Sequence, residues 1–494
     1  MAPENKLFRT LRLLIVGVLP IIGGCSAVAP GNASVPVPVA TRPSRSTCEI
    51  EQTAFHQTVP RSPDTTMPPA PAASTPFAGA AELSVDTLVE QVLDRNPSLA
   101  QMVAAYQAVS ARYPQVTSLE DPMLMGKVGP FAIGTNEVRD HWYAVEVSQK
   151  VPWCGKLGLR GESALAEANA AGKDVDDMRL QMVESARSAF YDYYLAERAL
   201  EVNAENLDLL KKFETSAEDR YSKGLVPQQD VMQARVEIGR ERDRRLALEE
   251  SRQIALARIN TLMHLPPDGP LPKPPRDIRP SESLPDPVQL RASALARRPD
   301  LQAIANRIQA EEARLGSAQK EFCPDFEVAA GYDAFWDVKS QRPEVTVRMN
   351  VPIYQDKRHA AVSEAQARVA ERKAELARQT DQVNFQVEEA YQKVARSEKS
   401  VRLYEGTILP DAKKNVEAAR SAYETGKVPF LTLIEAQRNQ VMLRDRYYEA
   451  IADYFRRRAT LERVSGGPLA PATPPEASTT ENGPTPAKLS PAVR

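Results

Sequence analysis

The sequence has little glycine, few aromatic residues and few cysteines for its length. Its 494 residues include 22 Gly and 4 Cys, and only 6% are aromatic, whereas 26% carry a charge. A chain of this composition favours long amphipathic helices over a compact α/β enzyme domain. The cysteines are too few for a disulfide-rich scaffold, and no two of them form a Cys-x-x-Cys pair.

An excess of charge of one sign is also missing. The formal net charge at pH 7 is only -2. A protein that binds phosphates usually carries a strongly basic domain or face. Nucleic acid is therefore not an expected partner.

Sequence motifs of catalysis and of cofactor or metal binding are missing as well. The chain has no nucleotide-binding Gly-Lys-Ser/Thr loop and no Ser-His-Asp grouping. His141, His264 and His359 fall in different predicted elements and have no His, Cys or carboxylate partner at ligand spacing. We therefore expect no catalytic residue, no cofactor and no metal site, and we do not expect an enzyme.

The N-terminus resembles a secretion signal. Basic residues precede an apolar run, 13–22, that is too short to cross a bilayer as a helix but suits a signal peptide. The run ends in IIGGCS, which is similar to the cleavage site of bacterial lipoproteins. This similarity predicts a signal peptide over 1–24, acylation of Cys25 by a palmitate-type chain and, because Ser26 follows, release to the outer membrane. An ordinary signal peptide with an incidental cysteine is the alternative.

Proline is concentrated near both ends of the chain. Residues 25–80 and 468–494 are rich in Pro, Ala, Ser and Thr and show little apolar periodicity. Such segments bury too little apolar surface to fold. We predict a linker over the first range and a disordered tail over the second.

Between these segments the sequence repeats itself. Three landmarks recur in the same order 200 to 202 residues later: Pro97 and Pro299, Pro152 and Pro352, and Gly224 and Gly426. Such spacing indicates a tandem duplication. We predict a first structural repeat over 81–273 and a second over 274–467, related by a pseudo-symmetry axis.

Each repeat contains a predicted strand hairpin, at 122–151 and at 325–353. The clearest alternation runs from Val345 to Val351, with an apolar side chain at every second position. In a soluble sheet such an apolar face meets a core, whereas in a membrane barrel it meets lipid and the polar face lines water. Four strands are too few to close a useful barrel, and lipid tolerates no open edge, so the membrane interpretation requires several chains per barrel.

The helices that follow the strands are long. No proline lies between Gly155 and Tyr221, and apolar residues recur at helical spacing. At 1.5 Å per residue this segment forms a rod of roughly 100 Å. We predict long helical hairpins over 155–263 and 357–464. Pro410 interrupts the second and should kink it.

Both hairpins turn at the same signature, Tyr-x-x-Gly-x-Val-Pro, in RYSKGLVPQQDVMQA and in AYETGKVPFLTLIEA. These turns, the order of elements and the Val-Pro that leads from strand into rod resemble the TolC family of outer-membrane efflux proteins. The WCGK segment at 153–156 is most similar to the branch that serves heavy-metal and related resistance-nodulation-division (RND) pumps. The resemblance covers 83–467.

The resemblance implies a mainly α-helical fold with a β membrane segment. Each chain would be a tandem-repeat protomer of a homotrimer. Its twelve-stranded outer-membrane β-barrel, with four strands per chain, would continue as a long periplasmic α-helical barrel. The chain would be lipid-anchored in the outer membrane and extend into the periplasm.

The implied function is the outer-membrane channel of a tripartite efflux system. It would be a passive conduit that carries small molecules or metal ions from an inner-membrane RND-type pump and a periplasmic adaptor (membrane fusion) protein to the exterior. The pump chooses most substrates in such systems, so the sequence does not identify the cargo. Two other classes stay open: a lipid-anchored periplasmic coiled-coil scaffold or adaptor protein, and a lipid-anchored enzyme.

The resemblance also implies roles for the turn residues. In the family the turns meet the helical hairpin of the adaptor, so the docking candidates here are Gly224, Leu225, Val226, Gly426, Lys427 and Val428. Glycine after a long helix can adopt the left-handed conformation that ends it, and proline preorganises the first turn of the next helix. A mere reversal of the helix is the alternative.

Two acidic residues just past the turns are candidates for the tunnel aperture. Asp230 and Glu435 match positions where some family members carry gate acids. Repeated by trimer symmetry, they would form rings of negative charge that favour cations. Lys427 and Arg438 are candidate ion-pair partners, and solvated surface carboxylates are the alternative.

Cys154 and Cys323 lie near strand ends that are expected on the same periplasmic side. A disulfide between them is the alternative to the free thiols that we expect.

Overall fold

The computed structural model describes most of the chain between residues 77 and 469. The described residues are 77, 81–128, 143–280, 284–334, 336 and 338–469. The expected signal peptide, Cys25 and His141 lie outside them, as does nearly all of the expected linker and tail. The chain divides into units 1–69 and 70–494, and the fold described below is that of the second unit.

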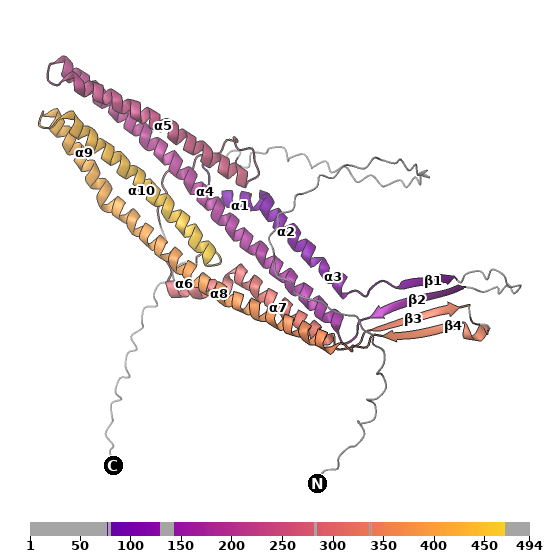
Figure 1. The fold of residues 1–494 in the computed structure, drawn as a ribbon. Coiled ribbons are helices and arrows are strands. Elements are labelled where there is room, and N and C mark those ends of the chain that lie inside the picture. The colour runs from indigo at the N-terminus through magenta and orange to yellow at the C-terminus, as the bar shows by residue number, and fades with distance from the viewer. Residues whose placement is uncertain are drawn as a thin grey trace, which may run out of the picture. The chain divides into compact units, whose positions relative to one another are not determined.

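Both predicted repeats contain short helices, two strands, a long helix and a return helix in that order (Figure 1). The first contains α1 (Val85–Arg95), α2 (Pro97–Ser110), α3 (Arg112–Thr117), β1 (Met123–Val128), β2 (Tyr143–Val151), α4 (Lys156–Ser222) and α5 (Gln228–Leu262). The second contains α6 (Pro287–Arg297), α7 (Pro299–Lys320), β3 (Phe326–Asp333), β4 (Pro343–Met349), α8 (Gln355–Leu403), α9 (Leu409–Glu424) and α10 (Phe430–Val464).

The short helices begin where proline allows them to begin. Pro97 and Pro299 are the first residues of α2 and α7, where the missing backbone N–H has no partner to lose. Asn96 caps α2, because its side-chain oxygen accepts a hydrogen bond from the Ser98 N–H at 2.9 Å. Its side-chain amide also donates to the carbonyl oxygen of Leu262 at the end of α5. The cap therefore holds α2 against the end of the return helix.

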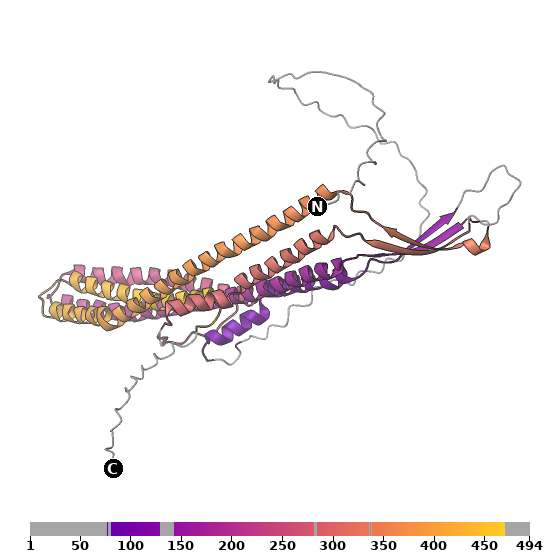
Figure 2. The ribbon, with the colours of Figure 1, turned by 90° about the horizontal axis from the view of Figure 1, so that it is seen from below.

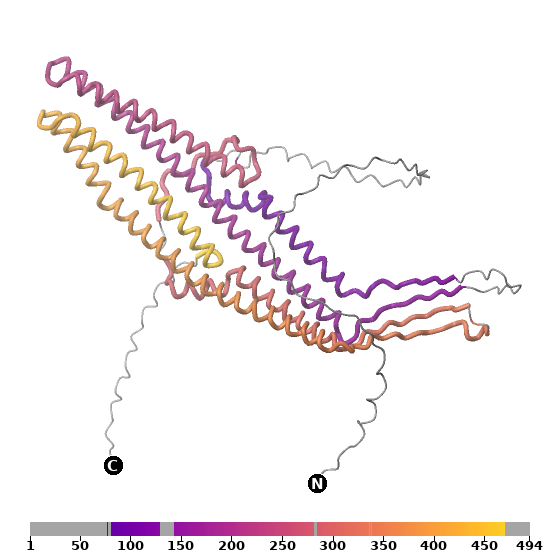
Figure 3. Tube along the Cα trace, in the orientation of Figure 1, coloured from indigo at the N-terminus to yellow at the C-terminus, as the bar shows by residue number. Residues whose placement is uncertain are grey.

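The four strands that the structure describes form one antiparallel sheet in the order β1-β2-β3-β4. The central pair, β2 and β3, joins the two repeats, with Val147 opposite Ala330. The chain enters the sheet from α3 and α7 and leaves it into α4 and α8 (Figure 3). The sheet thus lies at the starting ends of both long helices.

Alternation gives the sheet two different faces, as the sequence pattern predicts. On one face apolar side chains are open to solvent, and Leu124 and Val345 are 74% and 78% exposed. On the other face Glu146 is buried, and it binds both terminal nitrogens of Arg348 at 2.8 and 2.9 Å. Small side chains on β3, such as that of Ala329, lie between the two strands that hold this pair.

The helices pack as two antiparallel hairpins, α4 with α5 and α8–α9 with α10 (Figures 1 and 2). Helix α4 also packs on α7 and α10, and α8 packs on α7. The largest fully buried side chains of this core include Phe190, Tyr194 and Tyr454. Among the helices that the structure describes, none is long and apolar enough to cross a membrane.

The irregularity predicted at Pro410 is present. A π-helical segment, Tyr404–Ile408, separates α8 from α9 and ends two residues before this proline. Pro410 has no N–H to donate to the preceding turn, so the backbone there departs from α geometry.

Candidate functional site

The two turns close the helices with the same backbone hydrogen bonds. In the first, Gly224 N–H donates to Tyr221 O and Leu225 N–H donates to Arg220 O, both at 2.9 Å. The second repeats this pattern, with bonds from Gly426 to Tyr423 and from Lys427 to Ala422. This pair of bonds is the Schellman motif, which requires a left-handed residue just past the helix.

The glycines supply that left-handed residue. Gly224 has φ of 71° and Gly426 has φ of 72°. A Cβ atom at either position would meet nothing within 4 Å. The turns therefore need glycine for its backbone conformation and not for lack of space. Pro227 and Pro429 occupy the N-cap positions of α5 and α10, one residue before the first helical residue.

The six docking candidates differ in exposure. Leu225 is 63% exposed, and Lys427 and both glycines are also exposed. Val226 and Val428 are half-buried and pack against the hydrophobic cluster that joins the two hairpins near the turns. The valines therefore anchor the turns, while Leu225 and Lys427 point to solvent.

A set of contacts ties one turn to the other. Arg220 donates from Nη1 to the carbonyl oxygen of Glu424 at 2.8 Å, and its guanidinium lies 5.1 Å from the centre of the Tyr423 ring. The Tyr423 hydroxyl donates to Oδ2 of Asp230 at 3.2 Å. We call Arg220, Tyr423 and Asp230 the turn clamp.

Burial and charge oppose each other in the turn clamp. Burial raises the pKa of Asp230, while the hydrogen bond from Tyr423 and the charge of Arg220 act to lower it. Burial, together with the nearby Asp230 charge, raises the pKa of Tyr423 to about 12. The tyrosine thus remains a hydrogen-bond donor at neutral pH.

The tyrosine of the Tyr-x-x-Gly-x-Val-Pro signature has a different environment in each repeat. Tyr423 is 4% exposed, whereas Tyr221, at the same place in the first turn, is 46% exposed. Sequence reasoning missed Arg220 and Tyr423 as site residues. A difference in sequence could have indicated them: the residue before this tyrosine is Arg220 in the first repeat and Ala422 in the second.

The structure does not pair the two aperture candidates in the expected way. Asp230 binds Tyr423, and Glu435 is exposed on α10. Arg438, an expected partner of these acids, instead forms a two-pronged ion pair with Glu237 on α5. Burial alone would raise the pKa of Glu237, but the hydrogen bonds and charge of Arg438 hold it below its ordinary value.

Cys154 and Cys323 form a disulfide, with Cα atoms 6.5 Å apart, so the expectation of free thiols was wrong. The reason is the antiparallel register of β2 and β3. It places Val151 opposite Phe326, so that the connectors just beyond these residues meet. Within the described ranges no group of three or more His, Cys, Asp or Glu side chains has the arrangement of a metal site.

Comparison with known proteins agrees with this architecture. The curated relative CzcC of Cupriavidus metallidurans, a cobalt-zinc-cadmium resistance protein, is 23% identical over 306 residues, which is 61% of this chain and 70% of CzcC. The outer-membrane channel OprN has a TM-score of 0.68 at 20% identity, over 78% of this chain and 90% of OprN. CusC, described as forming a transmembrane channel, has a TM-score of 0.68 at 17% identity, over 78% of this chain and 93% of CusC.

The match to a family extends over most of the folded part. The model of the outer membrane efflux protein family matches residues 88–263 and 290–467, one segment in each repeat. These segments include both turns, all four strands and both long helices. The chain therefore belongs to the outer membrane efflux protein family.

Proposed function

We propose that the protein is the outer-membrane channel of a tripartite efflux system and acts as a passive conduit for small molecules or metal ions. Three copies would share a twelve-stranded barrel, and their long helices would form a periplasmic tunnel. An inner-membrane RND-type pump and a periplasmic adaptor would deliver the cargo. The observation that carries this proposal is the four-stranded sheet, which is incomplete in one chain.

The edges of the sheet support assembly with other copies. Among the described strands, β1 pairs only with β2, and β4 pairs only with β3. Each outer edge therefore has backbone groups that no strand in the described part of the chain pairs. In lipid such groups must be paired, so β1 of one copy is proposed to join β4 of the next until the ring closes.

The faces of the sheet support the same conclusion. Leu124 and Val345 belong to an apolar face of the sheet and are 74% and 78% exposed. Lipid is the solvent that such a face fits. The ion pair of Glu146 and Arg348 lies on the opposite face, which is proposed to line the water-filled channel.

The turns are proposed to contact the adaptor. They lie at the far end of α4 from the sheet, and its 67 residues give a separation of roughly 100 Å. Of the six docking candidates, Leu225 and Lys427 are the two that present an exposed side chain there. The turn clamp is proposed to hold the tunnel aperture, with Asp230 inside the clamp and Glu435 on the open surface of α10.

The nature of the cargo is proposed from the relative and the motif. CzcC is named for resistance to cobalt, zinc and cadmium, and WCGK resembles the heavy-metal branch. Divalent metal ions are therefore the proposed cargo to test first. Acylation of Cys25 would add a membrane anchor to the barrel.

The test is extraction of the protein from purified outer membranes. We expect a heat-modifiable trimer that opens ion-conducting pores in planar bilayers. A protein released as a monomer without pore activity would refute the channel and favour a lipid-anchored scaffold. Mass spectrometry of the mature N-terminus decides separately whether Cys25 is acylated.

A further inference from the structure

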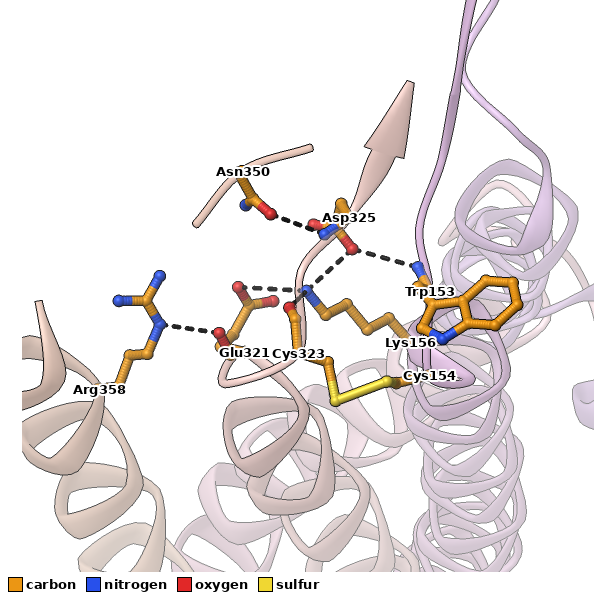
Figure 4. The surroundings of a disulfide bond; sticks show 8 residues. All are labelled: Trp153, Cys154, Lys156, Glu321, Cys323, Asp325, Asn350 and Arg358. Carbon is orange, nitrogen blue, oxygen red and sulfur yellow. Dashed lines mark hydrogen bonds and ion pairs between the residues drawn. A yellow bond between two sulfur atoms is a disulfide. The ribbon is translucent and has the colours of Figure 1, made fainter. Parts of the chain in front are cut away.

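A disulfide ties the two repeats together where the strands meet the long helices (Figure 4). Cys154 lies in the connector from β2 to α4, and Cys323 lies in the connector from α7 to β3. The two positions are 169 residues apart in the sequence. A cross-link that closes so long a loop restricts the unfolded chain strongly.

A buried ammonium group joins the same two connectors. Lys156, the first residue of α4, is fully buried. Its Nζ lies 2.9 Å from Oδ1 of Asp325 and 3.7 Å from Oε2 of Glu321, and it donates to the carbonyl oxygen of Cys323 at 3.1 Å. A buried charge that loses its partners is strongly destabilising. If the connectors separated, Lys156 would therefore become exposed to solvent or would stay buried without its ion-pair partners.

The residues around Lys156 are also hydrogen-bonded to the segment after β4 and to α8. Trp153 N–H donates to Oδ1 of Asp325 at 3.2 Å, and Asp325 N–H donates to Oδ1 of Asn350, which follows β4, at 2.6 Å. Arg358 of α8 donates to the carbonyl oxygen of Glu321 at 2.8 Å. We call the contacts around Lys156 and the disulfide the sheet–helix joint.

We propose that Cys154 and Cys323 form a modification site that a disulfide-donating oxidoreductase closes after secretion, and that the closed bond keeps the sheet–helix joint together in the assembled trimer. The proposal rests on the proposed function, because that function places the joint in the oxidising periplasm. Both cysteines are only half-buried, which leaves them within reach of a donor.

The exchange balances with such a donor. One cysteine thiolate attacks a sulfur atom of the donor disulfide, which breaks the donor S–S bond and forms a mixed disulfide. The second thiolate then attacks the mixed disulfide, and the Cys154–Cys323 bond forms. Two electrons and two protons leave with the donor, which is released as a dithiol.

The first test compares the heat stability of the trimer with and without a reductant. We expect the dissociation temperature of the wild-type trimer to fall by several degrees after reduction. The Cys154→Ser/Cys323→Ser variant should dissociate at the lower temperature under both conditions. Cys48→Ser keeps the pair and should respond as the wild type does. An unchanged temperature in wild-type protein whose thiols are shown to be alkylated after reduction would overturn the role in the joint.

The second test concerns the donor. In cells that lack their secretory disulfide-donating oxidoreductase, alkylation and mass spectrometry should find free thiols at both positions. A disulfide that forms fully in those cells would refute enzymatic closure. If the double Ser variant fails to assemble, reduction of preassembled wild-type trimers still decides the role of the bond.

These results are separable from the proposed function. If the trimer conducts ions and its dissociation temperature does not change on reduction, only the proposed role of the disulfide is contradicted. If the disulfide forms but the protein neither trimerises nor conducts ions, the proposed channel function is contradicted. Hydrogen exchange adds a local readout, since reduction should speed exchange at 153–156 and 321–326 and leave the distant turn at 220–230 unchanged.

Discussion

The hydroxyl of Tyr423 donates a hydrogen bond to the carboxylate of Asp230 at 3.2 Å, and this bond joins the second helical hairpin to the first. Both residues lie within a few positions of the turns. The bond therefore couples the two turns of one chain, at the end that is proposed to open.

Removing this hydroxyl should loosen the turns. Tyr423→Phe keeps the ring that packs on Arg220 and Phe430 but deletes the donor to Asp230. A hydrogen bond to a charged group is worth about 1.5–3 kcal/mol when buried and less in this half-buried setting. We expect a higher open probability in single-channel recordings. The matched control is Tyr221→Phe, at the exposed equivalent position, and equal effects of the two changes would contradict the clamp.

The turn clamp should also make the free energy of unfolding depend on pH. The folded protein holds the pKa of Asp230 above 3.8, its ordinary value. The folded state therefore binds this proton more tightly than the unfolded state, and the contribution is complete below the ordinary pKa and is lost as pH rises through the folded pKa. Asp230→Asn should remove that loss. The free energy of unfolding of this variant, relative to that of the wild type, should therefore rise as the pH rises from the ordinary pKa of Asp230 through its folded pKa.

Thermal unfolding at a series of pH values measures this difference. Glu237→Gln is the control of opposite sign, because the pKa of Glu237 is held below its ordinary value of 4.5. Its contribution is present above that value and is lost as pH falls through the folded pKa. Parallel pH profiles for the two variants would argue against the electrostatics described for the turns.

Bulky residues in place of the turn glycines should block export. Gly224→Leu/Gly426→Leu forces side chains onto a left-handed backbone, at a cost of about 1–2 kcal/mol per site, and adds bulk to the proposed docking surface. We expect loss of resistance in cells but an intact, membrane-inserted trimer. Gly239→Ala in α5, where a Cβ meets nothing within 4 Å, should leave export unchanged. Normal resistance in the double variant would rule out docking at the turns.

The acidic residues near the turns should influence ion selectivity. If Asp230 and Glu435 face the aperture, Asp230→Ala/Glu435→Ala removes two negative charges per chain and should lower the preference for cations. The reversal potential in a salt gradient across a planar bilayer measures this preference. An unchanged potential would identify both as surface or structural carboxylates.

The two faces of the sheet should respond differently to charge. Val345→Arg places a cation on the exposed apolar face and should cost about 2–4 kcal/mol at mid-membrane depth, so insertion of the trimer should fail. Thr346→Arg, one position later on the other face, should insert normally and change only conductance. Equal insertion of both variants, scored by heat-modifiable trimer in outer-membrane fractions, would be incompatible with a lipid-facing sheet.

Much of the fold follows from periodicity, which is a local property. The alternation from Val345 to Val351 predicts β4, and the proline-free run after Gly155 predicts the length of α4. Both patterns depend only on the geometry of a strand or a helix. The duplicated glycine signature likewise predicts two turns of one kind, and both of these turns have the backbone hydrogen bonds of a Schellman motif.

The contacts between repeats were harder to predict. The two turns carry the same signature, yet only Tyr423 is buried, because Arg220 packs on it from the other hairpin. The free thiols expected at Cys154 and Cys323 were wrong because the register of β2 on β3 brings these connectors together. Neither packing nor register is visible in the periodicity of a single segment.

The sequence by itself determined the duplication, the strands, the long helices and the backbone of the turns, since each depends on residues close together in the chain. Only the tertiary structure decided which side chains meet across the repeats. The bond between Tyr423 and Asp230 spans 193 residues, and the disulfide spans 169. Such contacts form because the hairpins pack side by side and the central strands pair in one register, and packing selects among many sequence-compatible partners.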